Sequence, residues 1–470
     1  MRLRLHSRVT HMHRVYQNPR SLFQMKNLLF KAGLSGLAIA ISFCSCAPAT
    51  DYKKTLNDPL LFCKTVKKLN NVVLENNFPP MIATRNYTYA TIAAYEVIAA
   101  GDPQHYQSLA GQVKALKPLP VPADTSKINF PLAAMLAFTK VGNAVTFPEG
   151  SLMGYYESLV NMADSLGMPE DILTGTKAFS DTIVSSIMAW AKGDNYAQTR
   201  SASRYTVTND PGRWIPTPPM YAQAVEPHWM EIRTMVLDSA SQFRPAPPPP
   251  FTPKDTNSTF YKALKEVEII GNSLTDEQKH IADFWDDNPF KLNVSGHVMF
   301  ATKKFSPAGH WMNIVGIAAK TSGADFNTTV TGYAKTAIAL YDAFISCWEG
   351  KYVYNFVRPE TVINANLDAD WRPYIQTPPF PSSASGHATV SAAAAETMTS
   401  IFGDNLKFTD TSLLEFGIAN RQIASFRMAA AEAAMSRLYG GIHYRFDNDL
   451  GAASGKKTGE LVVSKLKMKK

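Results

Sequence analysis

Helical periodicity is the feature that most constrains the fold of this chain. Apolar residues recur mostly at steps of three and four through two long segments, about 59–192 and 258–465. The segment between them, 195–256, is rich in proline and is expected to be coil. We find no convincing two-residue alternation typical of strands and no repeat at a fixed period. The sequence therefore predicts an all-α fold: a large helical domain of two stacked helix bundles with long Pro-rich loops.

The chain is expected to divide into four parts. Residues 1–45 would be a signal peptide, 46–56 a polar tether, 57–250 an N-terminal helical region and 251–470 a C-terminal helical region. In the last region, 412–430 and 431–438 are expected to be helical. The coil of 195–256, with at most a short helix near 229–240, allows two interpretations. It is an inter-bundle linker, or a loop that shapes the mouth of a pocket with the side chains Trp214, Trp229, Phe243 and Arg244.

The positive charge of the chain comes from its N-terminus. The formal net charge is +8, from 47 basic and 39 acidic residues. Residues 1–45 carry seven of the basic residues and none of the acidic ones, which leaves 40 against 39 and a net charge of +1 for the rest. A nearly neutral body gives no indication of nucleic-acid binding, so a basic site must be local.

The N-terminal segment has the pattern of an export signal. Met25 and Lys26 precede the apolar run 32–43, which is too short to span a bilayer. Its end, Phe43-Cys44-Ser45-Cys46, is similar to a bacterial lipobox. It would make Cys46 the lipidated first residue of an exported lipoprotein, anchored to a membrane and facing the periplasm or the cell exterior. Ordinary signal cleavage without a lipid is the alternative. Residues 1–24 are expected to be an upstream start-site extension.

Two cysteines then remain, Cys63 and Cys347. Export would permit a disulfide, but the two are far apart in the sequence, and free thiols are expected. Neither is accompanied by a histidine and an acid in a pattern typical of a catalytic cysteine.

Three short stretches of the C-terminal region combine cations, histidines and a helix start. They contribute Lys351 and Arg358 before Pro359, then Ser385-Gly386-His387, then Arg437, His443 and Asp447 around Gly440-Gly441. Together these groups could hold a tetrahedral oxyanion and carry out acid–base chemistry on it. We therefore expect 251–470 to be the catalytic region.

Each stretch has a physical rationale. Lys351 and Arg358 are seven residues apart, which would place both cations on one face of a helix that Pro359 ends or kinks. Gly386 lets backbone N–H groups at a helix N-terminus approach an anion. Asp447, one helical turn past His443, could hold the tautomer of that imidazole.

Taken singly, these stretches are common. A lysine and an arginine two turns apart are usually a solvated face. A second Ser-Gly-His at 295–297 has no companions and is expected to be structural, and His310 is expected to be a satisfied structural or pocket-edge histidine. The order of the three stretches is the specific feature.

That order, Lys-x6-Arg-Pro, Ser-Gly-His and Arg-x5-His-x3-Asp, resembles the signature of the type 2 phosphatidic acid phosphatase and vanadium haloperoxidase superfamily. The motifs cover residues 348–447, and the helical region 55–465 is similar to the soluble bacterial haloperoxidase-like branch. Ala384 stands where the proline before Ser-Gly-His is usual. The resemblance implies that Lys351, Arg358, Ser385, Gly386 and Arg437 bind vanadate or phosphate.

It also implies the roles of the remaining residues. His443 would bind vanadium, or attack phosphorus in a phosphatase; His387 would be the acid–base group; Asp447 would orient His443. Trp348 and Phe380 resemble the halide-site lining of vanadium chloroperoxidases, although both could equally be core residues.

Three functions remain open at this point. The first is a vanadium-dependent haloperoxidase-like enzyme that uses vanadate, hydrogen peroxide and a halide. The second is a phosphatase that hydrolyses phosphomonoesters through a phospho-histidine and needs no cofactor. The third is a non-catalytic oxyanion-binding lipoprotein, which the pair His387 and His443 argues against, since capture alone needs no acid–base group. The expected partners are small molecules and, through a lipid only, a membrane; the oligomeric state stays open.

Overall fold

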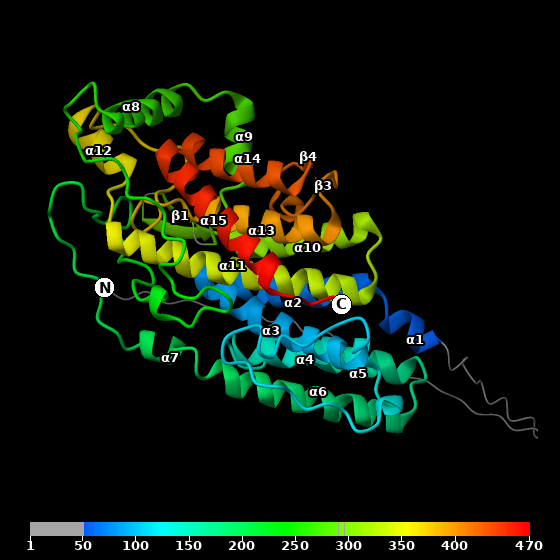
Figure 1. The fold of residues 1–470 in the computed structure, drawn as a ribbon. Helices are drawn as coiled ribbons and strands as arrows, with labels where there is room; N and C mark the ends of the chain where they lie inside the picture. The colour runs from blue at the N-terminus through cyan, green and yellow to red at the C-terminus, as the bar shows by residue number, and fades with distance from the viewer. Residues whose placement is uncertain (1–50, 290, 296) are drawn as a thin grey trace, which may run out of the picture. The chain divides into compact units, whose positions relative to one another are not determined.

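Helices make up most of the structure, a computed structural model that describes residues 51–289, 291–295 and 297–470 (Figure 1). The predicted all-α class is confirmed. The helices are α1 (Asp51–Leu56), α2 (Pro59–Glu75), α3 (Pro80–Gly101), α4 (Phe130–Ala144), α5 (Met153–Ser165), α6 (Glu170–Ala191), α7 (Tyr196–Thr199), α8 (Thr259–Asn272), α9 (Asp276–Phe284), α10 (Pro307–Ser322), α11 (Phe326–Tyr354), α12 (Pro359–Asn366), α13 (Gly386–Phe402), α14 (Phe426–Tyr439) and α15 (Arg445–Lys465).

The longest of these helices, α11, lies at the centre of the fold. It packs against α2 and α3 on one side and against α13 and α15 on the other (Figure 1). Helix α11 carries apolar and small residues on all of its faces and is buried along nearly its whole length. This is expected for a helix that has no polar face to turn toward solvent. Helices α3, α4, α5 and α6 form one bundle, and α10, α13, α14 and α15 form the second. The predicted stacking of two bundles is confirmed, with α11 between them.

A seam of glycines brings α15 against α13. Gly451, Gly455 and Gly459 recur at steps of four and therefore lie on one face of α15. A Cβ atom at these positions would lie 2.7, 1.9 and 2.7 Å from the carbonyl oxygens of Ser385, Thr389 and Ala393, which also recur at steps of four on α13. Because no side chain separates the helices, the first turns of α13 and α15 lie next to each other. The start of α13 carries Ser385-Gly386-His387, and the first turn of α15 carries Asp447.

Gly455→Ala is expected to lower the free energy of unfolding by about 3 kcal/mol or more, because the added methyl group meets backbone rather than a movable side chain. Urea denaturation measures the effect. Gly154→Ala, also in a helix but with open space around the position, is the matched control and should leave stability unchanged or raise it by up to ~1 kcal/mol. Equal stability of the two variants would contradict the close packing of α13 on α15.

The prediction of no strands was wrong in two places. An antiparallel hairpin pairs β1 (Lys291–Ser295) with β2 (Val298–Thr302), and a shorter one pairs β3 (Phe408–Asp410) with β4 (Arg421–Ile423). The second hairpin occupies much of 412–430, where a helix was expected. Gly417 adopts φ +75° there, and Asp410 accepts the N–H of Ser412, so the chain turns back instead of continuing a helix. Residues 431–438 belong to α14, which begins earlier than expected.

Two further expectations need correction. Residues 51–56 of the expected tether form α1, with Tyr52 and Leu56 buried. The segment 229–240 contains only one turn of 3-10 helix, Trp229–Glu231. After this turn the backbone N–H groups of residues 235–237 donate to the buried carboxylate of Asp342 in α11, which holds the chain in a bend instead of a helix.

The Pro-rich segment 195–256 shapes a pocket, but through residues other than the four expected. Its Pro218, Met220 and Val225 line the cavity described below. Trp214 and Trp229 are instead fully buried in the protein. Arg244 forms an ion pair with Glu349, and the carbonyl of Phe243 accepts a hydrogen bond from Ser454. The two tryptophans therefore pack into the protein, while Pro218, Met220 and Val225 form part of the pocket wall.

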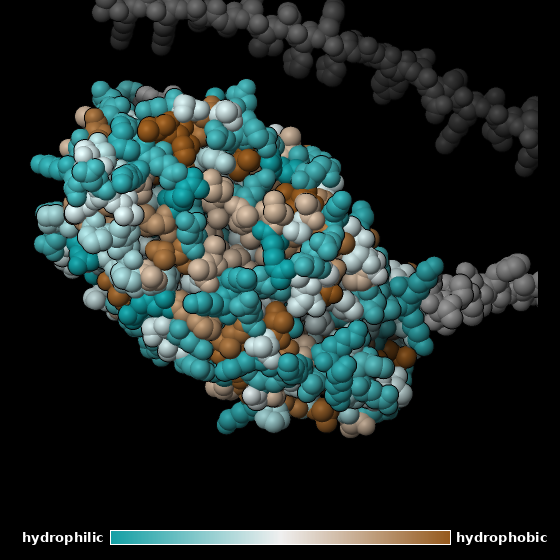
Figure 2. All heavy atoms as spheres, turned by 45° about the horizontal axis from the view of Figure 1, so that its top comes forward, coloured by the Kyte–Doolittle hydropathy of each residue, from teal (hydrophilic) through white to brown (hydrophobic). Residues whose placement is uncertain are grey.

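Hydrophilic residues dominate the face drawn in Figure 2, where hydrophobic residues appear as scattered small patches. Among the described residues, none of the helices has the length and apolarity needed to cross a membrane. The expected signal peptide, Cys44 and the expected lipidation at Cys46 lie outside the described residues. Cys63 and Cys347 are both free thiols, Cys347 fully buried and Cys63 partly exposed, as expected.

Candidate active site

Residues of the second and third sequence stretches line one cavity of about 590 Å³. Gly386 and His387 from the start of α13, Arg437 from the end of α14, and His443 from the turn before α15 line it. Much of the remaining wall is apolar, including Phe344, Trp348, Phe380 and several prolines. The site is thus a set of cationic and imidazole groups at an apolar pocket.

Lys351 and Arg358 converge behind this lining, though not in the way the spacing suggested. Helix α11 ends at Tyr354, Asn355 turns the backbone into the left-handed region with φ 48°, and Arg358 is the cap residue of α12, which Pro359 begins. The prediction that one helix face carries both cations was therefore wrong.

The backbone of residues 380–382 brings these two cations together instead. The Lys351 ammonium donates to the carbonyls of Pro381 and Ser382 at 2.8 Å each, and Arg358 Nε donates to the carbonyl of Phe380 at 2.9 Å. Both charged groups lie about 5 Å from the ring centroid of Phe380. A loop supplies the convergence that a helix was expected to supply.

Ser385, Gly386 and His387 open helix α13. Ser385 is its N-cap, and its hydroxyl accepts the N–H of Ala388 at 3.4 Å. Gly386 lines the cavity, and a Cβ atom there would only reach van der Waals contact, 3.7 Å from the ring of Trp348. The helix N-terminus and its free N–H groups therefore favour an anion at this point.

His443 is held as a neutral imidazole whose Nε2 lone pair faces Arg358. Its Nδ1 lies 3.0 Å from Asp447 Oδ2, and its Nε2 accepts a hydrogen bond from Arg358 Nη1 at 3.0 Å. Burial, with Arg358 and Lys351 adding to it, lowers the pKa of His443 well below its usual value. A neutral ring that donates from Nδ1 to Asp447 leaves Nε2 as the ligand atom.

Asp447 is itself fixed by several donors. The Ser382 hydroxyl donates to Asp447 Oδ2 at 2.5 Å, and the Tyr444 N–H reaches the same oxygen at 3.3 Å. Burial raises the pKa of Asp447, while the Ser382 hydrogen bond and the charge of Lys351 act against that rise. Ser382 belongs to the site and was missed from the sequence, because a serine three residues before Ser385 has no distinguishing pattern.

The three cations are buried together; Asp286, Asp287 and Asp447 lie near enough to act on their charge, but among the described residues none of these carboxylates forms an ion pair with them. Burial lowers the pKa of Lys351 to about 7, of Arg358 to about 9 and of Arg437 to about 10. Arg358 Nη2 and Arg437 Nε are buried without a hydrogen-bond partner in the part of the chain that the structure describes. Buried donors without acceptors are costly, so the cluster is suited to a bound anion. A tetrahedral oxyanion such as vanadate or phosphate fits this donor set.

His387 faces an aspartate that the sequence did not single out. Its Nε2 lies 3.7 Å from Asp287 Oδ2, and neither atom has a hydrogen-bond partner among the described residues. Burial, then the charge of Arg437, lowers the pKa of His387 well below its usual value. Asp286 and Asp287 both line the cavity and also interact with Arg437. No spacing relates them to the three stretches, since they follow α9 and reach the site only through the fold.

Trp348 and Phe380 both line the cavity and contact each other, with ring centroids 5.0 Å apart. The indole N–H of Trp348 donates to the carbonyl of Val225 at 3.2 Å, which ties the Pro-rich segment to α11. Two other histidines were judged structural. His297 is exposed in the turn of the first hairpin, and His310 is fully buried with both ring nitrogens bound, as expected for a satisfied histidine.

Binding of a tetrahedral dianion is expected to take up a proton above pH 7. The pKa of Lys351 is about 7 without an anion, and a bound anion raises it, so the affinity should fall as the pH rises above 7 and be level below it. Calorimetric titration with sulfate, which does not titrate in this range, in two buffers of different ionisation enthalpy measures the uptake. Lys351→Met should abolish it, and undiminished uptake in that variant would contradict the assignment.

Comparison with known proteins places this geometry in a family. The family model described as VCPO second helical-bundle domain matches residues 332–469. Among curated proteins, none matches the chain. A solved structure described as the first bacterial vanadium-dependent iodoperoxidase is 41% identical, covers 87% of this chain and 97% of its own, and superposes with a TM-score of 0.82.

A bacterial vanadium-dependent chloroperoxidase shares the fold at lower identity. Its holo form is 16% identical over 82% of this chain and 92% of its own, with a TM-score of 0.61. Its apo form is 18% identical, covers 83% of this chain and 95% of its own, and has the same TM-score of 0.61. The relative that is 41% identical covers 87% of this chain. The chain therefore belongs to the vanadium-dependent haloperoxidases and is an enzyme of that family.

Proposed function

We propose that this enzyme oxidises halide with hydrogen peroxide on vanadate held in the cavity described above. The observation that carries the proposal is the neutral His443, whose Nε2 lies against Arg358 in a buried cluster of three cations, two of which keep a guanidinium nitrogen without a hydrogen-bond partner among the described residues. A binding protein for oxyanions would need the cations alone. The ligand nitrogen and a second imidazole, His387, add a coordination site and a proton carrier.

The residues divide the work of holding the oxyanion. Lys351, Arg358 and Arg437 balance its negative charge, and the planar guanidinium groups donate in pairs to its oxygens. The Ser385 hydroxyl and the Gly386 N–H are the neutral donors at the start of α13. His443 Nε2 would be the ligand to vanadium, with Asp447 fixing the tautomer from behind. Vanadate, when bound, supplies the Lewis-acidic centre at which peroxide becomes an oxidant for halide.

Proton supply is the second task of the site. Oxidation of a halide ion by hydrogen peroxide consumes one proton and yields hypohalous acid and water. His387 lines the cavity and is held neutral when no anion is bound, so it can take a proton from peroxide and return one to the departing oxygen.

Iodide is the halide we propose. It is the largest and least strongly hydrated of the common halides, so an apolar wall with aromatic rings opposes its entry least. Trp348 and Phe380 provide these rings, and the Lys351 and Arg358 charges lie behind Phe380. The relative that is 41% identical is described as an iodoperoxidase.

A paired assay tests the proposal. The protein is stripped of metal and oxyanions, reloaded with orthovanadate, and given peroxide with iodide, bromide or chloride; a chromogenic phosphate ester is given to the vanadate-free protein in parallel. We expect halide oxidation that requires vanadate, is fastest with iodide and is inhibited by phosphate. Ester hydrolysis inhibited by vanadate, without halide oxidation, would identify a phosphatase. Vanadate binding with neither activity would indicate an oxyanion-binding protein.

We also infer from the sequence that the enzyme is exported and anchored by a lipid on Cys46. The support is the lipobox-like Phe43-Cys44-Ser45-Cys46 after a short apolar run. Metabolic labelling with an alkyne fatty acid in a bacterial host tests it. We expect label on the wild type and none on Cys46→Ser; equal labelling of both proteins would refute the anchor.

A further inference from the structure

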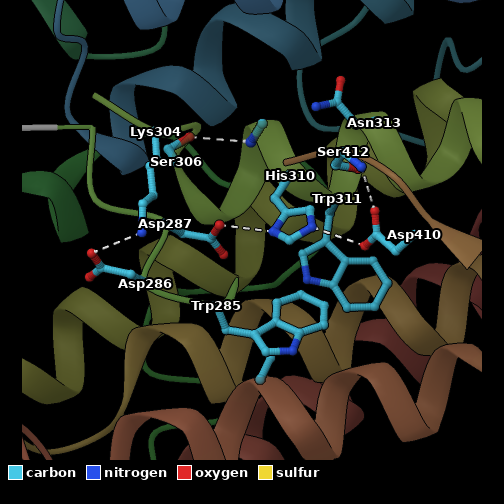
Figure 3. Close-up of polar contacts among 12 residues, drawn as sticks. Trp285, Asp286, Asp287, Lys304, Ser306, His310, Trp311, Asn313, Asp410 and Ser412 are labelled. Carbon is cyan, nitrogen blue, oxygen red and sulfur yellow. Dashed lines mark hydrogen bonds and ion pairs between the residues drawn. The ribbon is translucent and has the colours of Figure 1, made fainter. Parts of the chain in front are cut away.

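A buried histidine outside the cavity is bound by two carboxylates at once. His310, on α10, is fully buried. Its Nδ1 lies 2.8 Å from Asp287 Oδ1, and its Nε2 lies 3.0 Å from Asp410 Oδ2 on β3 (Figure 3). The indole of Trp285 stacks on the imidazole with centroids 4.7 Å apart and an angle of 25°. Haloperoxidase chemistry at the cavity makes no direct use of this group.

The geometry specifies the charge of His310. Ionised carboxylates only accept hydrogen bonds, so both ring nitrogens must carry a proton for both contacts to be favourable. Burial acts to lower the pKa of His310, but Asp287 and Asp410 outweigh it and raise that pKa to about 10. His310 is therefore an imidazolium throughout the physiological pH range, and its two hydrogen bonds are charge-assisted.

The same aspartate reaches the candidate active site with its other oxygen. Asp287 Oδ1 is bound by His310, while Asp287 Oδ2 faces His387 Nε2 at 3.7 Å. The residues beside it are held as well: the Trp285 carbonyl accepts from Arg437 Nη1, and Asp286 Oδ2 lies 3.5 Å from Lys304 Nζ (Figure 3). A continuous chain of groups, Asp410, His310, Asp287 and His387, thus connects the second hairpin to the cavity.

We propose that His310 and Asp410 are positioning residues that act through Asp287. His310 holds the Asp287 carboxylate with Oδ2 directed at His387, so that the proton of the neutral His387 ring resides on Nε2 and Nδ1 is the basic atom. This resembles the way a carboxylate fixes the tautomer of a metal-bound or catalytic histidine. The role in turnover rests on the proposed function, whereas the effect on the His387 tautomer does not.

A purely structural role for His310 predicts something different. A structural anchor would lower stability when replaced, and its loss would add to any effect at Asp287. A positioning role predicts that His310→Gln has no additional effect on the His387 tautomer or on kcat when Asp287 has already been replaced by asparagine. A double-mutant cycle of His310→Gln and Asp287→Asn separates the two, because glutamine fills similar space but cannot donate to both carboxylates as an imidazolium does.

The first readout is nitrogen-15 NMR of histidine-labelled protein without vanadate. In the wild type, we expect His310 to be protonated at both nitrogens and His387 at Nε2. In His310→Gln and in Asp287→Asn, the Nε2–H preference of His387 should weaken to the same degree, and the double variant should be no different. The control His105→Gln removes an exposed histidine that also pairs with an aspartate, Asp102, and should leave His387 unchanged.

The second readout is turnover with vanadate, peroxide and iodide. Each single variant should lose about 10–100-fold in kcat, as second-shell partners of catalytic histidines do, with the double variant no worse than Asp287→Asn. If His310→Gln does not fold, Asp410→Asn takes its place in the cycle. The NMR spectrum of that variant should then show that His310 has lost the proton on Nε2. An unchanged His387 tautomer in the His310 or Asp410 variant, or additive losses in kcat, would overturn the proposal. A tautomer change without halide oxidation by the wild type would refute the proposed function alone.

Discussion

Vanadate-dependent halide oxidation is expected to fall by at least ~10²–10³-fold when His443 is replaced by alanine, the range seen when one preorganised group at a reacting centre is removed. His443 is 2% exposed, Asp447 fixes its Nδ1, and its Nε2 is a neutral nitrogen that lies 3.0 Å from Arg358 Nη1. Steady-state iodide oxidation under saturating vanadate measures the loss.

The control for this variant is His105→Ala, which removes an exposed histidine far from the three stretches in sequence. It should retain wild-type turnover. Circular dichroism and thermal unfolding of His443→Ala distinguish a lost ligand from a lost fold. Full turnover in a folded His443→Ala protein would remove the basis for the site described here.

A large loss of oxyanion affinity is expected for Arg437→Met. Arg437 is 3% exposed, lines the cavity and has a buried Nε without a partner among the described residues. Removing one member of a buried charge pair typically costs about 2–5 kcal/mol, which is ~30–5,000-fold in affinity. Calorimetric titration with vanadate and with phosphate measures the change, and both anions should lose affinity because they share one shape.

Arg427→Met is the matched control, because Arg427 lies on the same helix α14 but forms its ion pairs at the surface with Glu396 and Asp404. It should bind vanadate as the wild type does. Arg437→Met that binds vanadate with wild-type affinity would show that this cation is not part of the oxyanion site.

The sequence was sufficient for the fold class because the helical period persists over long segments. It failed where local turns decide the structure. Asn355 and Gly417 adopt left-handed backbone, and each ended or prevented a helix that the periodicity favoured. Sequence periodicity describes which face is buried, but a single residue with positive φ can reverse the chain direction.

The candidate site, too, was predicted from the sequence only in part. Residues of the three stretches converge as expected, since the order of the motifs carries that information. Lys351 and Arg358 nevertheless meet through the carbonyls of the 380–382 loop, not along a helix. Asp287 reaches His387, and His310 reaches Asp287, through contacts between segments that are far apart in sequence. Ser382 binds Asp447 but has no distinctive spacing to the motifs. A single sequence therefore gives no pattern from which these three residues could be predicted.

Vanadium X-ray absorption of the loaded enzyme tests the central claim most directly. If His443 Nε2 binds vanadium in the cavity of Lys351, Arg358 and Arg437, the wild type will show one vanadium per chain with oxygen neighbours and a single nitrogen neighbour. The nitrogen neighbour will disappear in His443→Ala. Vanadium with oxygen neighbours only in the wild type, or an unchanged spectrum in His443→Ala, would contradict the account.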